Sequence, residues 1–173
     1  MKHELLALVF CVATAHFSNG SMVGISSDQL DGTLKSSHLG MRVWVEKGSH
    51  KVNVDSNGLI LKGYDPVAYF VQNKAVKGSP QYTSTYQGAK YYFSSAANLA
   101  TFKKNPSKYV PQYGGFCANG VKNNQLRDCD PTVFFIAKSK LYLCESPSVL
   151  QEFRAHEDED IVTANRNWQQ LLH

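Results

Sequence analysis

Polar and apolar residues alternate along two stretches of the chain, and a short polar turn interrupts each stretch. In "QYTSTYQGAKYYF", Tyr82, Ser84 and Tyr86 share one face of an expected strand, and Gly88 lies in the turn. In "TVFFIAKSKLYLCE", two apolar arms flank residues 138–140. The alternation predicts two β-hairpins, over residues 81–93 and 132–145.

Helix signals accompany the first hairpin on both sides. Asp65 is placed to cap a helix in "YDPVAYF", and Pro66 occupies its first position, where a missing N–H costs nothing. A second helix is expected in "SAANLATFKKN", where Ser94 or Ser95 is the cap and Pro106 ends the helix. Both helices are short.

Two more helices are expected toward the C-terminus. One begins at Ser146 and Pro147, and the other follows the acidic run "HEDED", with Ile161, Ala164 and Trp168 at helical spacing. These elements together predict a small single α+β domain, built of two β-hairpins with short helices. No internal repeat and no glycine-rich nucleotide loop is apparent in the sequence.

The first 20 residues have the features of a secretory signal peptide. Lys2 precedes an apolar run over residues 5–15, and cleavage is expected after Ala15 or after Gly20. The run is too short for a membrane-spanning helix, which needs about 20 apolar residues. We therefore expect a secreted protein, extracellular or, if the source is bacterial, periplasmic.

The rest of the chain divides into two segments. Residues 21–56 are rich in Ser, Gly, Asp and Lys, and we expect a loosely structured segment with one edge strand at residues 43–45. Residues 57–173 carry the compact patterning and are expected to form the folded domain, with a C-terminal helical extension. No later segment resembles a membrane span.

Charge excludes one class of partner. The 173-residue chain has a net charge of +4, and its lysines are scattered, without an arginine-rich run. Nucleic-acid binding requires cations that are clustered on one face. We therefore expect no nucleic-acid partner.

Three cysteines remain once the leader and its Cys11 are removed: Cys117, Cys129 and Cys144. In an oxidising compartment, an odd number indicates one disulfide and one free thiol, or an intermolecular bond. Cys117 lies among glycines and aromatic residues, whereas Cys129 is in a polar loop and Cys144 ends a strand-like run. We expect the disulfide to join Cys129 and Cys144.

The stretch "KYVPQYGGFC" is the most site-like part of the sequence. Two glycines allow a close approach of the backbone to a ligand, and the hydroxyl of Tyr113 and the thiol of Cys117 are potential contacts. The alternative is a tight turn with Cys117 as a small buried side chain. Tyr64 and Asp65 are further candidate ligand contacts, although helix capping also explains Asp65.

Two blocks of the sequence carry a family resemblance. "LKGYDPVAYF" and then "YQGAKYYFSSAANLATFKKNPSKYVPQYGGFCA" resemble the YHS domain, in the stand-alone form of exported proteins. The likeness runs from about residue 57 to residue 117, so the domain expected at residues 57–173 is YHS-like. The resemblance implies a scaffold used in short modules for metal handling.

In those modules, cysteines stand at three positions that here hold Ala68, Ser94 and Asn98. These residues are poor ligands for soft metal ions, which prefer thiolates. Inherited metal binding at this position is therefore not expected.

Three functions remain open. The first is a secreted, non-catalytic YHS-type binding or extracellular matrix protein that engages an extracellular protein, the matrix or a small ligand. The second is a metal-handling protein in which Cys117 and a histidine bind copper or zinc. The third is a thiol-dependent enzyme, which would need a base beside Cys117.

Overall fold

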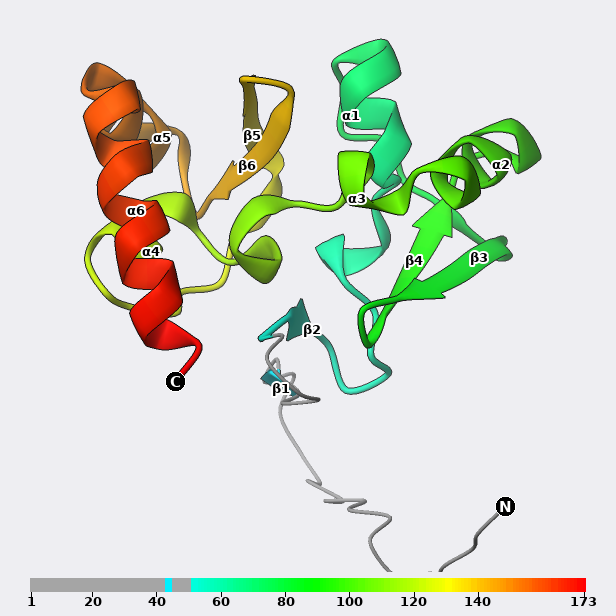
Figure 1. Ribbon diagram of the computed structural model, residues 1–173. Coiled ribbons are helices and arrows are strands. Elements are labelled where there is room, and N and C mark those ends of the chain that lie inside the picture. Colours follow the sequence, from blue (N-terminus) through cyan, green and yellow to red (C-terminus); the bar gives the residue numbers. More distant parts are fainter. Residues whose placement is uncertain (1–42, 45–50) are drawn as a thin grey trace, which may run out of the picture. The chain divides into compact units, whose positions relative to one another are not determined.

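The computed structural model describes residues 43–44 and 51–173, all within one unit, His38–His173 (Figure 1). The expected leader and most of the segment 21–56 lie outside the described residues. Strand β1 (Val43–Trp44) pairs antiparallel with β2 (Asn53–Val54), which agrees with an edge strand near residue 43. Val52 and Val54 are buried, so the core begins before residue 57.

Both predicted hairpins are present. Strand β3 (Ser79–Tyr86) pairs with β4 (Ala89–Phe93), and β5 (Asp130–Ala137) pairs with β6 (Lys140–Cys144), each as a separate antiparallel two-stranded sheet. The turns contain left-handed residues, at Gln87 and Gly88 and at residues 138–139. The expected α+β class with short helices is confirmed.

Six α-helices occur in the described part of the chain: α1 (Pro66–Gln72), α2 (Ala96–Lys104), α3 (Pro106–Tyr109), α4 (Ala118–Lys122), α5 (Pro147–Ala155) and α6 (Glu157–Leu171). Asp65, Ser95 and Ser146 cap three of them, as expected. The short helices α3 and α4 are not predicted by the sequence. No helix in the part of the chain that is described has the length and apolar character needed to cross a membrane.

The order of elements repeats, which the sequence pattern does not reveal. The first module (residues 61–109) runs η1 (Leu61–Gly63), α1, β3, β4, α2, α3, and the second module (residues 112–171) runs η2 (Gln112–Gly115), α4, β5, β6, α5, α6. Leu61, Lys62 and Gly63 all have positive φ, and so do the last three residues of η2. Each module therefore opens with the same left-handed turn before a short helix.

Strand register repeats as well. Ser79 pairs with Phe93 in the first hairpin, and Asp130 pairs with Cys144 in the second, an offset of 51 residues (130 − 79 and 144 − 93). All five pairs keep this offset, and both hairpins have an irregularity after the first pair. Only scattered identities mark the repeat in the sequence: Gly63/Gly114, Asn73/Asn124, Pro80/Pro131, Tyr91/Tyr142, Ser95/Ser146, Leu99/Leu150 and Phe102/Phe153.

Strand β6 is shared by the two hydrophobic cores. Leu141 and Leu143 pack into the core of the first module, whereas Tyr142 and Cys144 pack into the core of the second. This follows from the two-residue period of a strand, which sends neighbouring side chains to opposite faces. Helix α1 adds a second connection, because the Tyr69 hydroxyl donates to the Pro131 carbonyl at 2.8 Å. The modules therefore form one structure.

Candidate functional site

The Asp65 carboxylate joins helix α1 to the end of the first hairpin. The side chain is fully buried, and its Oδ1 accepts hydrogen bonds from the backbone N–H groups of Val67 (2.8 Å) and Ala68 (3.3 Å). Its Oδ2 accepts from Ser94 N (2.8 Å), Ser94 Oγ (2.7 Å) and Asn98 Nδ2 (2.7 Å). Five donors surround one carboxylate, so its burial is compensated by hydrogen bonds.

This cluster occupies the position at which the family resemblance implies metal ligands. Ala68, Ser94 and Asn98 do converge, but each directs a donor toward Asp65. None of the three supplies a thiolate, and Asn98 Nδ2 also donates to Ser94 Oγ at 3.2 Å. The residues present do not fit a soft metal ion. They form a structural cluster.

Cys117 takes the place of Asp65 in the second module. Asp65 precedes helix α1 and its N–H donates to the Val76 carbonyl, and Cys117 precedes helix α4 and its N–H donates to the Arg127 carbonyl at 3.0 Å. Cys117 and Cys144 are fully buried free thiols, and their side chains are hydrogen-bonded to each other. A pair of thiols thus stands where the first module has a carboxylate.

The contact changes the acidity of both thiols. The hydrogen bond from Cys144 lowers the pKa of Cys117 to about 6. Burial acts in the opposite direction, and hydrogen bonds from backbone N–H groups in α4 and at residue 145 lower the pKa further. The same bond, together with burial, raises the pKa of Cys144. Another thiol and the backbone therefore acidify Cys117, which the residues next to it in sequence do not indicate.

The expected disulfide between Cys129 and Cys144 is not formed, since Cys144 is a free thiol. The alternation along β6 gives the reason. Cys144 points into the second core beside Cys117, whereas Cys129 packs in the first core. Cys129 is also buried, and so does not behave as a residue of an exposed polar loop.

Within the described residues, no histidine is among the groups that bond to Cys117. The groups that bond to its thiol are Cys144 and the backbone of residues 119, 120 and 145. Among residues 43–44 and 51–173, no group of three or more His, Cys, Asp or Glu side chains is arranged to hold a metal ion. The expected copper or zinc site on Cys117 thus receives no histidine ligand from these residues.

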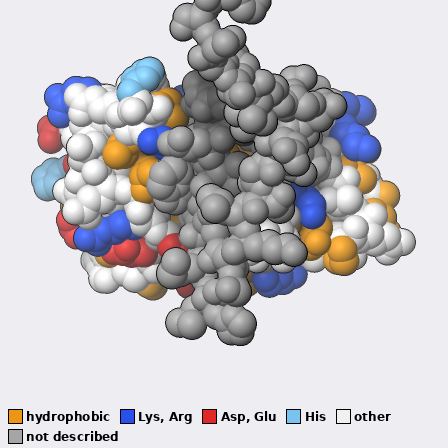
Figure 2. All heavy atoms as spheres, turned by 90° about the horizontal axis from the view of Figure 1, so that it is seen from below, with side chains coloured by type: hydrophobic (Ala, Val, Ile, Leu, Met, Phe, Trp, Pro, Cys, Tyr) orange, Lys and Arg blue, Asp and Glu red, His pale blue; other side chains and the backbone are white. Residues whose placement is uncertain are grey.

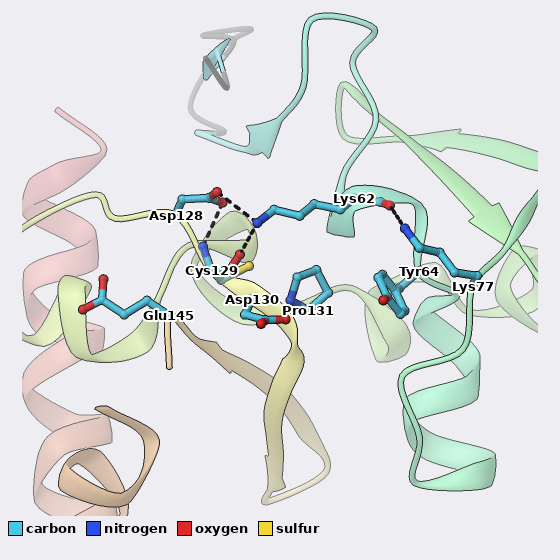
Figure 3. A pocket seen from close by; sticks show the side chains of 8 residues that line it. All are labelled: Lys62, Tyr64, Lys77, Asp128, Cys129, Asp130, Pro131 and Glu145. Atoms are coloured by element: carbon cyan, nitrogen blue, oxygen red, sulfur yellow. Dashed lines mark hydrogen bonds and ion pairs between the residues drawn. The ribbon is translucent and has the colours of Figure 1, made fainter. Parts of the chain in front are cut away.

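A polar pocket of about 520 Å³ lies between the modules (Figure 3). The first module contributes Lys62, Tyr64 and Lys77, and the second contributes Glu145. Residues 128–131, which enter β5 and also belong to the second module, complete the lining. The pocket therefore combines ammonium groups from one module with carboxylates from the other side.

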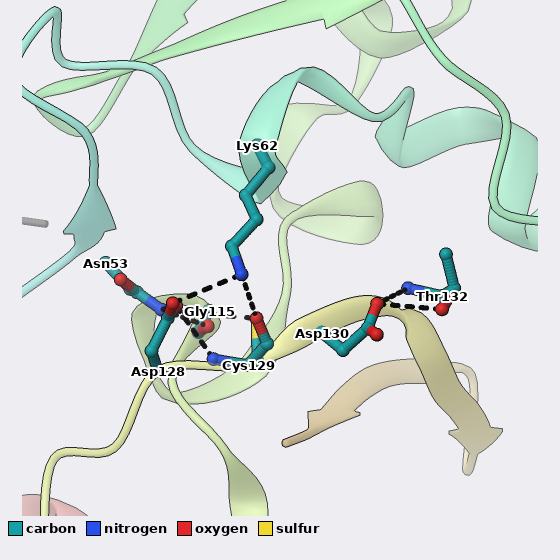
Figure 4. A network of polar contacts seen from close by, with 7 residues as sticks. All are labelled: Asn53, Lys62, Gly115, Asp128, Cys129, Asp130 and Thr132. Carbon is teal, nitrogen blue, oxygen red and sulfur yellow. Dashed lines mark hydrogen bonds and ion pairs between the residues drawn. The ribbon is translucent and has the colours of Figure 1, made fainter. Parts of the chain in front are cut away.

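A network of polar contacts holds the cationic side of this pocket (Figure 4). Lys62 Nζ donates to the Cys129 carbonyl at 2.8 Å and forms an ion pair with Asp128 Oδ2 at 3.2 Å. Asn53 Nδ2 donates to Asp128 Oδ1 at 2.9 Å and to the Gly115 carbonyl at 3.1 Å. The network ties β2 to both left-handed turns, so the pocket wall is positioned by several elements.

Lys77, Asp130 and Glu145 are the remaining charged residues of the pocket lining. Lys77 Nζ donates to the Lys62 carbonyl at 2.8 Å and lies 4.3 Å from the centre of the Tyr64 ring. Asp130 Oδ1 accepts from Thr132 N and Oγ1, and these bonds, followed by the charge of Lys62, lower the pKa of Asp130. Asp130 is therefore ionised at neutral pH.

The four residues proposed from the sequence as ligand contacts do not form one site. Tyr64 lines the pocket, but Asp65 and Cys117 are buried caps of two different helices. The Tyr113 hydroxyl donates to Asn165 Oδ1 at 3.0 Å, and Tyr113 does not line the pocket. No motif in the sequence marks Lys62, Lys77 or Asp130 as pocket residues. The sequence carries little sign that these three residues belong together, because they lie in separate segments that only folding brings to one pocket.

We predict that Asp65→Asn destabilises the protein by about 2–4 kcal/mol, because an amide cannot accept all five hydrogen bonds. Ser95→Ala is the matched control, since it removes one cap bond and costs about 1 kcal/mol. Urea unfolding of both variants measures the difference. Equal losses in the two variants would show that Asp65 does no more than an ordinary helix cap.

We also predict that Cys144→Ala raises the pKa of Cys117 from about 6 toward its ordinary value, because the thiol donor is removed. Ultraviolet thiolate absorbance against pH measures it, with Cys129→Ala as control. Since the folded pKa is the lower one, folding stability in the parent rises with pH between about 6 and about 8.5. The rise should disappear in Cys144→Ala, and its persistence would contradict the assignment.

The comparison with known protein families finds a match in the first module. The model of the YHS domain family matches residues 67–113, which extend from the first turn of α1 into η2. No curated protein and no solved structure matches the chain. The second module has the same element order but lies almost wholly outside the matched residues. The chain is thus a YHS domain-containing protein, with that domain at residues 67–113.

Proposed function

We propose that this protein is a secreted, non-catalytic binding protein, and that the pocket between its two modules holds a small zwitterionic molecule. The observation that carries the proposal is the pocket of about 520 Å³, in which opposite charges face each other across the junction. Sites for small molecules commonly have volumes of about 300–1,000 Å³ and a few placed polar groups. The pocket meets the volume condition, and five of its eight lining residues are charged.

Charge placement supports a zwitterion over a simple anion or cation. A carboxylate of the ligand would bind near Lys77, and an ammonium group would bind near Asp130 and Glu145. Lys62 is already held by Asp128 and the Cys129 carbonyl, so it positions the wall more than it contacts a ligand. Tyr64 offers a ring beside the cationic end.

Binding without catalysis is favoured by the state of the two reactive candidates. The Asp65 carboxylate is occupied by five donors, and the Cys117 thiol is buried against Cys144. A nucleophile needs both access and a base to accept its proton. The thiol-enzyme and metal-handling alternatives therefore have less support, and a matrix role depends on partners other than this pocket.

The zwitterion hypothesis predicts selective binding of a free amino acid. L-Leucine should bind in calorimetry, whereas leucinamide, which lacks the carboxylate, and N-acetylleucine, which lacks the ammonium group, should bind roughly tenfold more weakly. Lys77→Gln should remove the discrimination against leucinamide, and Asp130→Asn the discrimination against N-acetylleucine.

Lys140→Gln is the control for this experiment, because it removes one exposed charge from the start of β6, outside the pocket lining. It should bind L-leucine as the parent does. Absence of L-leucine binding, or equal binding of all three compounds, would contradict a zwitterion site.

Secretion is a separate part of the proposal, supported by the apolar run at residues 5–15 and the small residues around Ala15. Expressed from the full chain in a secreting eukaryotic cell line, the protein should reach the medium with its leader removed after Ala15 or Gly20. A chain without residues 1–20 should stay in the cells. Mass spectrometry of both fractions tests this, and an intact chain retained in the cells would contradict secretion.

A further inference from the structure

The distribution of charge along the chain is far more uneven than its net value of +4 indicates. From residue 66 to residue 127 there is no Asp or Glu, and this stretch contains eight basic residues: Lys74, Lys77, Lys90, Lys103, Lys104, Lys108, Lys122 and Arg127. Eight carboxylates then fall between residues 128 and 160. The YHS domain at residues 67–113 therefore has a purely cationic set of charged side chains.

The space-filling view agrees with this distribution. In Figure 2, described atoms on the side of β3, β4 and α2 include basic side chains but no Asp or Glu, while the side of α5 and α6 has both signs. Neutralisation of this basic stretch by ion pairs is limited. Lys122 pairs with Asp160 and Arg127 pairs with Glu145, but no ion pair involves Lys103, Lys104 or Lys108 in the described part of the chain.

Three lysines are concentrated where α2 passes into α3. Lys103 and Lys104 lie in the last turn of α2, Lys108 lies in α3, and all three are exposed. We call Lys103, Lys104 and Lys108 the lysine cluster. The negative end of the α2 dipole offsets part of their mutual repulsion. The rest of their charge remains available to attract a polyanion.

We propose that the lysine cluster binds a linear sulfated polysaccharide. The inference goes beyond the pocket, since it concerns another face and a macromolecular partner. The choice of an extracellular polymer rests on the proposed secretion.

The side chains on this face favour recognition by charge alone. Residues 51–126 contain no arginine, which is the residue suited to bidentate contacts with bases and phosphates. The neighbouring aromatic residues Phe102 and Tyr109 are buried, so they cannot stack on nucleic-acid bases. Sulfate groups repeated along a flexible polymer need only clustered ammonium groups.

A heparin oligosaccharide is the probe for this proposal, and binding is measured by calorimetry over a series of NaCl concentrations. The parent should bind with a steep dependence on salt, as expected when a polyanion releases counterions. The triple variant K103Q/K104Q/K108Q should bind at least about tenfold more weakly at low salt. Its slope of log Kd against log salt should be shallower by about one unit per lysine that contacts the polymer.

The matched control is K138Q/K140Q/R166Q, which removes the same number of exposed positive charges from the second module. It should keep the parent affinity within about twofold, and thermal unfolding should show that both variants fold, as surface changes generally permit. Equal losses of heparin affinity in the two triple variants would show that binding depends only on net charge, and would overturn the proposal. Tighter binding of duplex DNA than of heparin would overturn the choice of partner. Neither result depends on the pocket or on secretion.

Discussion

The structure depends on the burial of strand β6 on both faces. Leu141 and Leu143 close the core of the first module, and Tyr142 and Cys144 close the core of the second. Each fully buried leucine contributes about 2 kcal/mol of hydrophobic stabilisation, and here that contribution holds the two modules together. The equivalent strand β4 has only one buried face, with Lys90 and Tyr92 on the other. The second hairpin therefore cannot be replaced by a copy of the first.

The two modules share a backbone plan but differ in the group that caps the first helix. In the first module, the Asp65 carboxylate collects donors from α1, Ser94 and Asn98. In the second, Cys117 takes the equivalent place, and its thiol is hydrogen-bonded to the Cys144 thiol and to backbone N–H groups. A carboxylate gives a cluster satisfied by hydrogen bonds, whereas the thiols give a pair with displaced pKa values. The first module does not fit a soft metal ion, because Ala68, Ser94 and Asn98 supply no thiolate and direct donors to Asp65.

Charge is separated between the modules, and both proposed binding regions follow from that separation. The pocket lies where ammonium groups of the first module face carboxylates of the second module. The lysine cluster lies in a stretch, residues 66–127, that contains no carboxylate side chain. A ligand with two opposite charges suits the junction, and a polymer with one repeated charge suits the exposed end of α2.

The sequence by itself determined the local elements of this protein. Alternation predicts both hairpins, capping residues such as Asp65 and Ser146 predict helix starts, and the motifs of the first module predict the YHS domain. These features depend on residues that are close in the sequence, so they can be predicted without knowledge of the fold. Tertiary structure decided the rest. The repeat is visible in strand register and in the left-handed turns more than in the side chains. The two faces of β6 place Cys144 in a different core from Cys129. Folding brings Lys62, Lys77 and Asp130 to one pocket. Contacts between distant residues depend on how strands and turns direct each side chain in space, and no local pattern records that direction.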